Sequence, residues 1–454
     1  MVSLLGWGGQ RVIAGSIPKA IPQTETSVDK SGRLSSYQPQ GATATASNAF
    51  FQSLGTNGRS CFTCHSPRDG WTISSADATK RFQETGGKDP LFRLVDGASC
   101  PSDDISTIAD MRAAYQLLLA QGLIRISLPV PSEPVLQFSI TSVNDPYDCN
   151  ANPLFGLTSP TTGLVSVYRR PLPATNLRFE STLMWDGREP NLDSQAIDAT
   201  LIHAQAAAPP DPVTLQQITD FETGVFTAQS SVRTNDLASD GATGGPVALS
   251  MQSFSTRIND PFGNPTGTPF DPNIFDLFEA WTTPGKDGSR AFRESIERGE
   301  RVFNTQTFTI SGVAGLNDVV GQASITGTCG TCHDTPNVGN RSVDGTMDTG
   351  VSDPVLYTGA LPLPAFTILC DSGPLAGHSF ATLDPGRALI TGQCADIGKV
   401  KVPALRGLAA RAPYFHNGSA PDLATVIEFY MMRFPTLVLS SQQEQDLTTF
   451  LNSL

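Results

Sequence analysis

The pentapeptide Cys-X-X-Cys-His occurs twice in this chain, and no other feature of the sequence constrains the fold as strongly. Residues 61–65 read Cys-Phe-Thr-Cys-His, and residues 329–333 read Cys-Gly-Thr-Cys-His. This pattern is the attachment signature of c-type haem, in which two cysteines bind the haem covalently and the histidine is an axial ligand of the iron. The sequence therefore predicts two covalently bound haem c groups. Their attachment residues are Cys61, Cys64, His65, Cys329, Cys332 and His333.

Other uses of a Cys-X-X-Cys pair fit this chain less well. Such a pair can be half of a zinc site or a thiol-disulfide centre. A zinc ribbon places its two pairs close together, whereas these pairs lie in opposite halves of the 454-residue chain. Each pair is also followed directly by one of only five histidines. Haem attachment is therefore the favoured interpretation.

Composition excludes several classes of partner. The net charge of -13 disfavours nucleic acid and anionic membranes, and it would suit a basic or dipolar redox protein. No apolar run approaches the roughly 18 residues that a membrane span needs. Charged residues make up 16% of the chain, against 41 glycines and 34 prolines, which predicts long ordered loops.

Four cysteines lie outside the haem motifs, at Cys100, Cys149, Cys370 and Cys394. They fall as two local couples, which predicts the disulfides Cys100–Cys149 and Cys370–Cys394, although spacing alone leaves the connectivity open. Disulfides and c-type haem both belong to oxidising compartments. The sequence therefore predicts a periplasmic or otherwise exported protein.

The two halves of the chain repeat one plan, an amphipathic helix followed by Cys-X-X-Cys-His. The second of these helices is predicted to be capped by Ser289 and the first by Ser47. The repeat predicts a mostly α fold of two cytochrome c-like haem domains with long loop insertions. The expected units are a loosely ordered lead-in over residues 1–40, an N-terminal haem domain over 41–285 and a C-terminal haem domain over 286–454.

Two helices are predicted at the C-terminal end. Ser419 and Asp422 can form a capping pair, and Ser441 can begin the last helix. The first of these helices has an apolar stripe with helical spacing, which points Tyr430 inward. The stripe consists of Leu423, Val426, Ile427 and Tyr430.

Two further segments, together with the haem motifs, carry a family resemblance. Residues 183–188 read Leu-Met-Trp-Asp-Gly-Arg, with Gln195 ten residues after the tryptophan. Residues 401–407 read Lys-Val-Pro-Ala-Leu-Arg-Gly, and residues 413–418 read Pro-Tyr-Phe-His-Asn-Gly. In this order, the segments resemble those of the bacterial di-haem cytochrome c peroxidase/MauG superfamily. The resemblance implies that the N-terminal haem faces peroxide and that the C-terminal haem stores or relays an electron.

The resemblance also assigns Trp185 to the space between the haems, as a bridge for electron hopping. The alternative is a tryptophan of the ordinary core, because any tryptophan has a large apolar surface to bury.

The sixth ligands are predicted to differ between the haems. Ordinary family peroxidases cap the first haem with a loop histidine, but no histidine lies between His65 and Arg170, so this haem is expected to be open, as in MauG-like members. Fourteen residues after His416 stands Tyr430, where MauG has tyrosine and ordinary peroxidases have methionine. Met431 is the rival ligand, and Met432 is expected to point away.

The pocket of the first haem departs from the family pattern. The family has a glutamate twenty residues after the tryptophan, and this chain has Gln205, which cannot exchange a proton. His203 could replace it because imidazole titrates near neutral pH. Gln195 is expected to hydrogen-bond the bound ligand. The alternative for His203 is a histidine at the surface or at a helix end.

The remaining motif residues are expected to support the cofactors. Arg406 and Lys401 can pair with haem propionates, and His416 can order its loop through a propionate or the backbone. The family often has calcium between its domains, but Arg170 and Arg411 occupy the ligand positions here. Arginine offers no oxygen ligand, so calcium is doubtful and an arginine-stabilised junction is expected.

The sequence as a whole predicts an exported di-haem oxidoreductase that uses hydrogen peroxide. Its partner would be a small redox protein, cytochrome c or cupredoxin, as in the peroxidases, or an organic or protein substrate oxidised at a distance, as in MauG. The alternative is an electron-transfer di-haem cytochrome without substrate chemistry.

Overall fold

The computed structural model describes residues 17–282 and 290–454. About 29% of the chain is helical and 18% is strand. The prediction of a mostly α fold is therefore wrong. Part of the error lies in the predicted loop insertions, because they contain six of the fourteen strands of the described residues.

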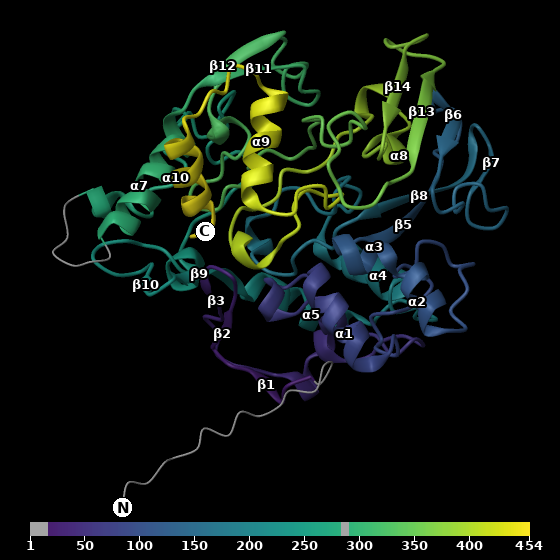
Figure 1. Ribbon diagram of the computed structural model, residues 1–454, viewed down its shortest axis with the longest axis horizontal. Helices are drawn as coiled ribbons and strands as arrows, with labels where there is room; N and C mark the ends of the chain where they lie inside the picture. Colours follow the sequence, from purple (N-terminus) through teal and green to yellow (C-terminus); the bar gives the residue numbers. More distant parts are fainter. Residues whose placement is uncertain (1–16, 283–289) are drawn as a thin grey trace, which may run out of the picture.

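The helices of the N-terminal half that are labelled in Figure 1 lie together in the lower part of the molecule. Of these, α1 and α3 pack on each other, and α4 packs on α5. Helices α2 and α3 are consecutive and are separated only by Tyr115. The helices are α1 (Ser75–Thr85), α2 (Ile108–Ala114), α3 (Gln116–Gln121), α4 (Leu192–Ile202), α5 (Pro212–Gly224) and α6 (Pro246–Ser250).

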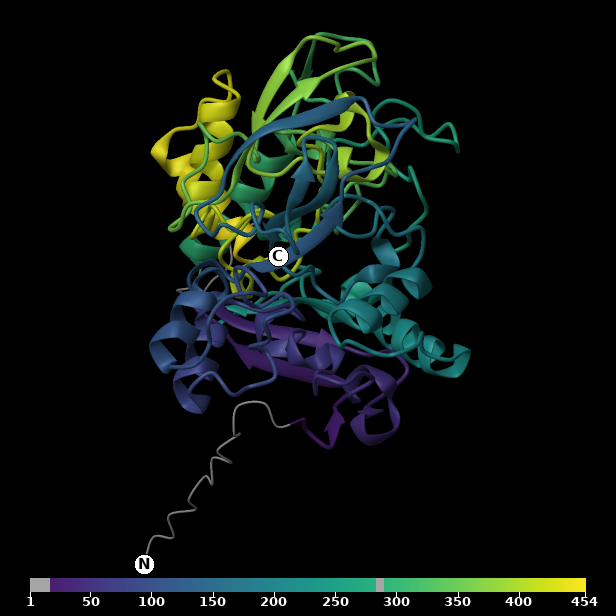
Figure 2. The ribbon, with the colours of Figure 1, turned by 90° about the vertical axis from the view of Figure 1, so that its right-hand side faces the viewer.

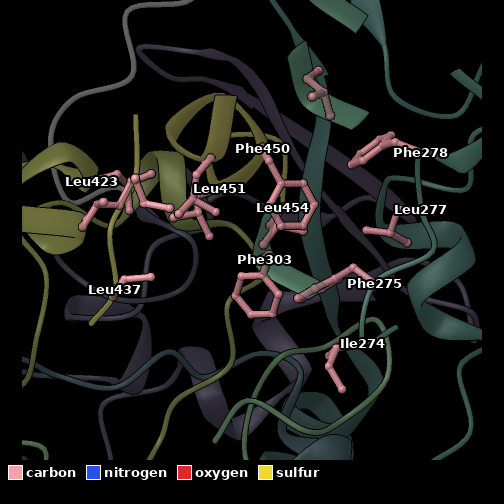
Figure 3. Close-up of a cluster of buried hydrophobic side chains, with 14 of the residues drawn as sticks. Ile274, Phe275, Leu277, Phe278, Phe303, Leu423, Leu437, Phe450, Leu451 and Leu454 are labelled. Atoms are coloured by element: carbon pink, nitrogen blue, oxygen red, sulfur yellow. The ribbon is translucent and has the colours of Figure 1, made fainter. Parts of the chain in front are cut away.

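The helices of the C-terminal half enclose the largest apolar core. Helix α7 crosses α10 at Gly299, where a Cβ atom would lie 2.1 Å from the backbone oxygen of Asp446. Figure 3 shows Phe275, Phe303 and Phe450 meeting in this core, with ring centroids 5.2 to 5.9 Å apart. The helices are α7 (Arg290–Thr305), α8 (Ala388–Thr391), α9 (Leu423–Arg433) and α10 (Ser441–Leu451).

The insertions of the two halves fold together. Strand β6 of the N-terminal half pairs with β13 of the C-terminal half, and the sheet lies beside β5 and β8 in Figures 1 and 2. The predicted disulfides Cys100–Cys149 and Cys370–Cys394 are confirmed. The strands are β5 (Ile124–Pro129), β6 (Phe138–Asn144), β7 (Leu157–Ser159), β8 (Thr162–Arg169), β13 (Ala365–Cys370) and β14 (Ser379–Thr382).

The predicted lead-in is ordered from residue 20 onward, where a loose segment was expected. Strand β3 lies inside a four-stranded sheet in the order β10-β9-β3-β2. Two further small sheets join β1 to β4 and β11 to β12. The strands are β1 (Ala20–Ile21), β2 (Thr24–Val28), β3 (Gly32–Tyr37), β4 (Thr43–Ala44), β9 (Phe226–Val232), β10 (Asn235–Asp236), β11 (Phe308–Ser311) and β12 (Ser324–Gly327).

Several helix starts differ from the expected ones by a few residues. The cap of α9 is Asp422 rather than Ser419, whereas α10 begins at Ser441 as predicted, with Ser440 as its cap. Asn48 caps the short 3-10 turn η2 (Ala49–Phe51), where Ser47 was expected to cap a helix. The predicted cap Ser289 and the predicted domain boundary at 285 lie outside the described residues. Among the helices of the described ranges, none is long and apolar enough to cross a membrane.

Candidate functional site: two haem-binding cavities

The two Cys-X-X-Cys-His motifs adopt the same local structure. Each begins as a 3-10 turn, η3 (Cys61–Thr63) and η7 (Cys329–Thr331). The residue before each turn donates its N–H to a threonine hydroxyl inside the motif, from Ser60 to Thr63 and from Thr328 to Thr331, at 3.0 Å in both cases. The threonine in the middle of each motif therefore closes the turn that presents the cysteines.

The two motif histidines are oriented in the same way. Nδ1 of His65 lies 2.8 Å from the carbonyl oxygen of Trp71, and Nδ1 of His333 lies 2.5 Å from that of Gly339. A carbonyl can only accept, so Nδ1 carries the proton and Nε2 keeps its lone pair. Burial lowers the pKa of both rings to about 4. Both are therefore neutral at pH 7, the form that binds a metal.

Each motif opens into a cavity. The first cavity has two lobes, and both are lined by His65, Trp185, Gln195 and Glu222. The second cavity is lined by His333 and Tyr430 and is mostly apolar. The motif cysteines also line these cavities: Cys61, Cys64, Cys329 and Cys332.

The residues of both cavities fit haem c. The four motif cysteines are free, although the chain forms two disulfides elsewhere. Buried guanidinium nitrogens of Arg406 and Arg411 have no hydrogen-bond partner among the described residues. Burial lowers the pKa of Arg406 to about 9 and that of Arg411 to about 10. Such uncompensated cations are suited to carboxylates such as haem propionates.

The predicted propionate partners differ in their surroundings. Arg411 lines the first cavity, whereas Arg406 lines neither cavity, although its neighbour Leu405 lines the second. Lys401 lines both cavities but already forms a buried ion pair with Glu180 at 2.7 Å. Arg411 is therefore an anchor candidate for the first haem that the sequence did not identify.

Trp185 lies where the two cavities approach each other. It lines both cavities, and so does Tyr414. The Trp185 indole donates its N–H to the carbonyl oxygen of Arg170 at 2.6 Å. Its ring centroid is 5.9 Å from that of His416, which lines the second cavity. An aromatic side chain thus separates the two cavities at this point.

Trp185 and His416 hold equivalent places in an internal repeat. Each stands in a tight loop closed by an isolated antiparallel bridge, Leu183 to Glu189 in one half and Tyr414 to Ala420 in the other. In both loops the residue before the aromatic ring has positive φ and a glycine follows two residues after it. Each loop leads directly into a helix, α4 or α9.

The repeat also aligns the candidate sixth-ligand positions. Tyr430 lies seven residues after the first residue of α9, and Ala199 lies seven residues after the first residue of α4. Tyr430 lines the second cavity and Ala199 lines the first. Met431 does not line the second cavity, and Met432 is 54% exposed, as expected. The first cavity therefore has an alanine, which cannot bind iron, where the second has a phenol.

The structure connects His203 to two residues that the sequence gave no reason to choose. Nδ1 of His203 lies 2.6 Å from Oδ2 of Asp96, and both carboxylate oxygens of Asp96 accept from Arg59, at 2.6 and 2.7 Å. Burial would raise the pKa of Asp96, but Arg59 and His203 outweigh it and lower the pKa. No sequence motif signals Asp96, because the contact spans 107 residues.

The first cavity includes two of the predicted pocket residues and excludes a third. His203 and Gln195 line it. Gln205 is exposed, has left-handed backbone at φ 56°, and bonds to Asn57 instead. The carboxamide that occupies the family's glutamate position is therefore outside the cavity.

A buried ion-pair network lies beneath the Trp185 loop. Arg169 donates to Asp186 at 2.5 Å and to Asp384 at 2.6 and 2.9 Å. Arg188 also donates to Asp186. Burial would raise the pKa of Asp186, but the two arginines outweigh it and lower the pKa. The residue next to Trp185 is thus fixed by two cations.

His416 and Arg170 join the two motif loops. The N–H of Arg170 donates to the carbonyl oxygen of His416 at 2.6 Å. The guanidinium of Arg170 donates to the carbonyls of Gln121 and Arg411, at 3.3 and 3.0 Å. His416 orders its loop through the backbone, and burial lowers the pKa of its ring to about 4. The guanidinium of Arg170 thus links the segment of Gln121 to the segment of Arg411 through their carbonyl oxygens.

Comparison with known proteins gives matches over limited parts of the chain. A family model described as RoxA-like, cytochrome c-like matches residues 401–432. The cytochrome-c peroxidase IdrP1 of Pseudomonas sp. (strain SCT) is 33% identical over 84 residues, which are 16% of this chain and 22% of that protein. IdrP1 of Denitromonas iodatirespirans is 32% identical over 88 residues, 17% of this chain and 23% of that protein. The chain thus matches less than a quarter of the length of these relatives.

Two solved structures are also similar in part. One is a MauG-like protein associated with microbial copper homeostasis, with a TM-score of 0.35, 17% identity and coverage of 64% of this chain and 74% of that one. The other is hydrazine synthase from Kuenenia stuttgartiensis, with a TM-score of 0.31, 16% identity and coverage of 63% and 73%. At family level, the sequence matches support a cytochrome c-type oxidoreductase and imply haem c. They confirm that the chain resembles the bacterial di-haem cytochrome c peroxidase/MauG superfamily.

Proposed function

We propose that this chain is an exported di-haem c-type oxidoreductase that activates hydrogen peroxide at its N-terminal haem and exchanges electrons with its C-terminal haem. Residues 41–285 and 286–454 would form the two haem domains. Haem c, when bound, supplies the redox chemistry and an iron centre for the peroxide. The two disulfides support an oxidising compartment such as the periplasm.

One observation carries this proposal, the difference between Ala199 and Tyr430 at equivalent places in the repeat. Tyr430 faces the cavity of His333, whose Nε2 is free to bind iron. Ala199 has no donor atom, so the first cavity keeps an open position beside His65. An open position is what a reacting small molecule requires, and a closed one suits electron storage.

The groups around the first cavity can hold and move a proton. Asp96 accepts from Nδ1 of His203, which leaves Nε2 as the atom available to the cavity. A carboxylate behind an imidazole fixes its tautomer and stabilises its protonated form. His203 can therefore take a proton from peroxide and return it to the departing oxygen. Gln195 can orient the peroxide through its carboxamide.

The residues between the cavities support electron exchange. Trp185 lines both cavities, and its indole is held by the hydrogen bond to Arg170. We assign it the role of bridge. The electrons would come from a small redox protein, a cytochrome c or a cupredoxin, or from a protein or organic substrate oxidised at a distance. The acidic net charge of -13 suits a basic redox partner.

Magnetic resonance of the ferric holoprotein tests the open first cavity. We expect one high-spin and one low-spin haem signal by EPR, since a cavity without a sixth protein ligand gives a weak axial field. Hydrogen peroxide should also change the absorption spectrum of the as-isolated diferric protein without prior reduction. Two low-spin signals and no reaction would contradict the proposal and favour a plain electron-transfer cytochrome.

Replacement of Tyr430 by phenylalanine tests the closed second cavity. The low-spin EPR signal is expected to be lost or strongly altered, while the high-spin signal stays unchanged. Met431→Leu is the matched control, because Met431 does not line the cavity. If Tyr430→Phe left the spectrum unchanged and Met431→Leu altered it, the ligand would be Met431.

A further inference from the structure

The first cavity contains a buried carboxyl group that none of the roles above uses. Glu222 of α5 is 5% exposed and lines both lobes of the cavity. No described residue donates a hydrogen bond to it, and its Oε2 is fully buried. A buried carboxyl without a partner is costly, because burial disfavours its charged form. Such a group in a cavity that fits a redox cofactor calls for a functional explanation.

The internal repeat shows that this acid is specific to the first cavity. Helix α5 follows α4 as α10 follows α9, and both pairs pack together. Ile218 and Glu222 lie six and ten residues after the first residue of α5. Leu447 and Leu451 hold the same places in α10 and line the second cavity. The second cavity thus has an apolar side chain where the first has an acid.

Glu222 forms no ion pair with a described residue, although several cations line the same cavity. The turn η2, which packs on α5, carries no titratable group. The charged residues of its other two neighbours, α4 and the 3-10 turn η5 (Leu177–Phe179), are exposed: Asp193, Asp198 and Arg178. Further titratable or charged groups that line the lobes of the cavity are His65, Arg59, Cys64, Asp96, Arg169, Arg170, Glu180, Arg188, His203, Lys401, Arg411 and Tyr414.

The Cys61 thiol lies close enough to Glu222 for the carboxylate charge to help raise the pKa of the thiol. Burial alone raises the pKa of Glu222 to about 8. At pH 7 the carboxyl is therefore mainly neutral, and it becomes an anion only in mildly alkaline solution. Its position near Cys61 places this change of charge beside a haem attachment point.

We propose that Glu222 is a proton-binding site coupled to the first haem. Glu222 takes up a proton when that haem gains an electron. The inference rests on the proposed function in that it assumes haem c in the first cavity. The electron adds a negative charge to the haem. This charge favours the neutral carboxyl, because repulsion between like charges is strong in a buried site. Reduction of one hydrogen peroxide to two waters consumes two electrons and two protons. Above about pH 8, where the carboxyl is ionised, Glu222 would take one of these protons from solvent as the redox partner supplies the electron. At pH 7 the carboxyl already holds this proton.

The reduction potential of each haem, measured by spectroelectrochemistry of the holoprotein from pH 6 to 10, tests this inference. The first haem should become harder to reduce as pH rises through about 8, with at most a tenfold change in equilibrium per pH unit, about 59 mV for one electron. Glu222→Gln keeps the shape of the side chain but cannot ionise, so its first haem should lose this slope. The second haem, beside Leu451, should be unaffected.

The matched control is Glu300→Gln. Glu300 is a buried glutamate of α7 whose pKa burial also raises to about 8, but it accepts from the backbone of Leu277 and Phe278 away from the first cavity. Equal slopes in the unaltered protein and in Glu222→Gln would overturn the inference, and so would equal loss in both variants. A pH-independent first haem in the unaltered protein would overturn it without any variant. These results do not depend on the reaction with peroxide, so they are distinct from a failure of the proposed function.

Discussion

The His203→Gln variant is expected to react with hydrogen peroxide about 10²- to 10⁴-fold more slowly than the unaltered protein, the usual loss when a general acid–base is removed. Glutamine can still form hydrogen bonds in the first cavity, but it cannot exchange a proton. The side chain of His203 is held by Asp96 with a separation of 2.6 Å, so the imidazole is already oriented before peroxide arrives. Asp96→Asn should also slow the reaction, because an amide can donate to Nδ1 and so favour the tautomer whose Nε2 carries the proton.

The measurement is the second-order rate constant from stopped-flow absorption of the ferric holoprotein. His378→Gln is the matched control, since His378 is an exposed histidine of the β13–β14 insertion. Its rate should equal that of the unaltered protein. A His203→Gln protein that reacts at the normal rate would remove His203 from proton transfer.

The Asp186→Ala variant is expected to lose about 3–5 kcal/mol of its free energy of unfolding, the typical cost of breaking a buried ion pair by removing one partner. Asp186 is fully buried. Its replacement leaves Arg169 paired with Asp384 alone and removes the ion pair between Arg188 and Asp186. The change also loosens the loop that fixes Trp185. Electron exchange between the haems should therefore slow even under conditions in which the variant is folded.

Chemical denaturation followed by circular dichroism measures the stability, and flash reduction measures electron exchange. Glu294→Gln is the control, because Glu294 pairs with Arg290 on the surface of α7, where such pairs contribute about 0.3–0.5 kcal/mol. If Asp186→Ala were as stable as this control, the network would not be a major support of the fold.

The parts of the site that could be predicted are those written in local sequence. Three features each lie within one short stretch of sequence: the haem motifs, the Trp185 loop and the helix that carries Tyr430. Each can therefore be recognised from the sequence without the folded structure. The two disulfides were also predictable, because each joins cysteines of one local segment. These features indicate haem c as the cofactor and predict the difference between the two cavities.

The parts that could not be predicted depend on contacts between distant segments. Asp96 and Asp384 are single aspartates in irregular chain, and only the folded protein brings them to His203 and Arg169. The helical prediction failed for a related reason. Strands β6 and β13 are separated by more than two hundred residues, and each segment alone looks like a loop rich in turns.

The pairing of β6 with β13 has a consequence for how the chain reaches its native state. During synthesis the N-terminal half emerges first and must wait with an unpaired strand edge until β13 follows. Exposed edges of this kind promote aggregation, so the interval is a hazard that shielding by other factors in the cell would reduce. The same strand pairing makes the two halves depend on each other. If they were expressed as separate fragments, each fragment would expose an unpaired strand edge of this sheet.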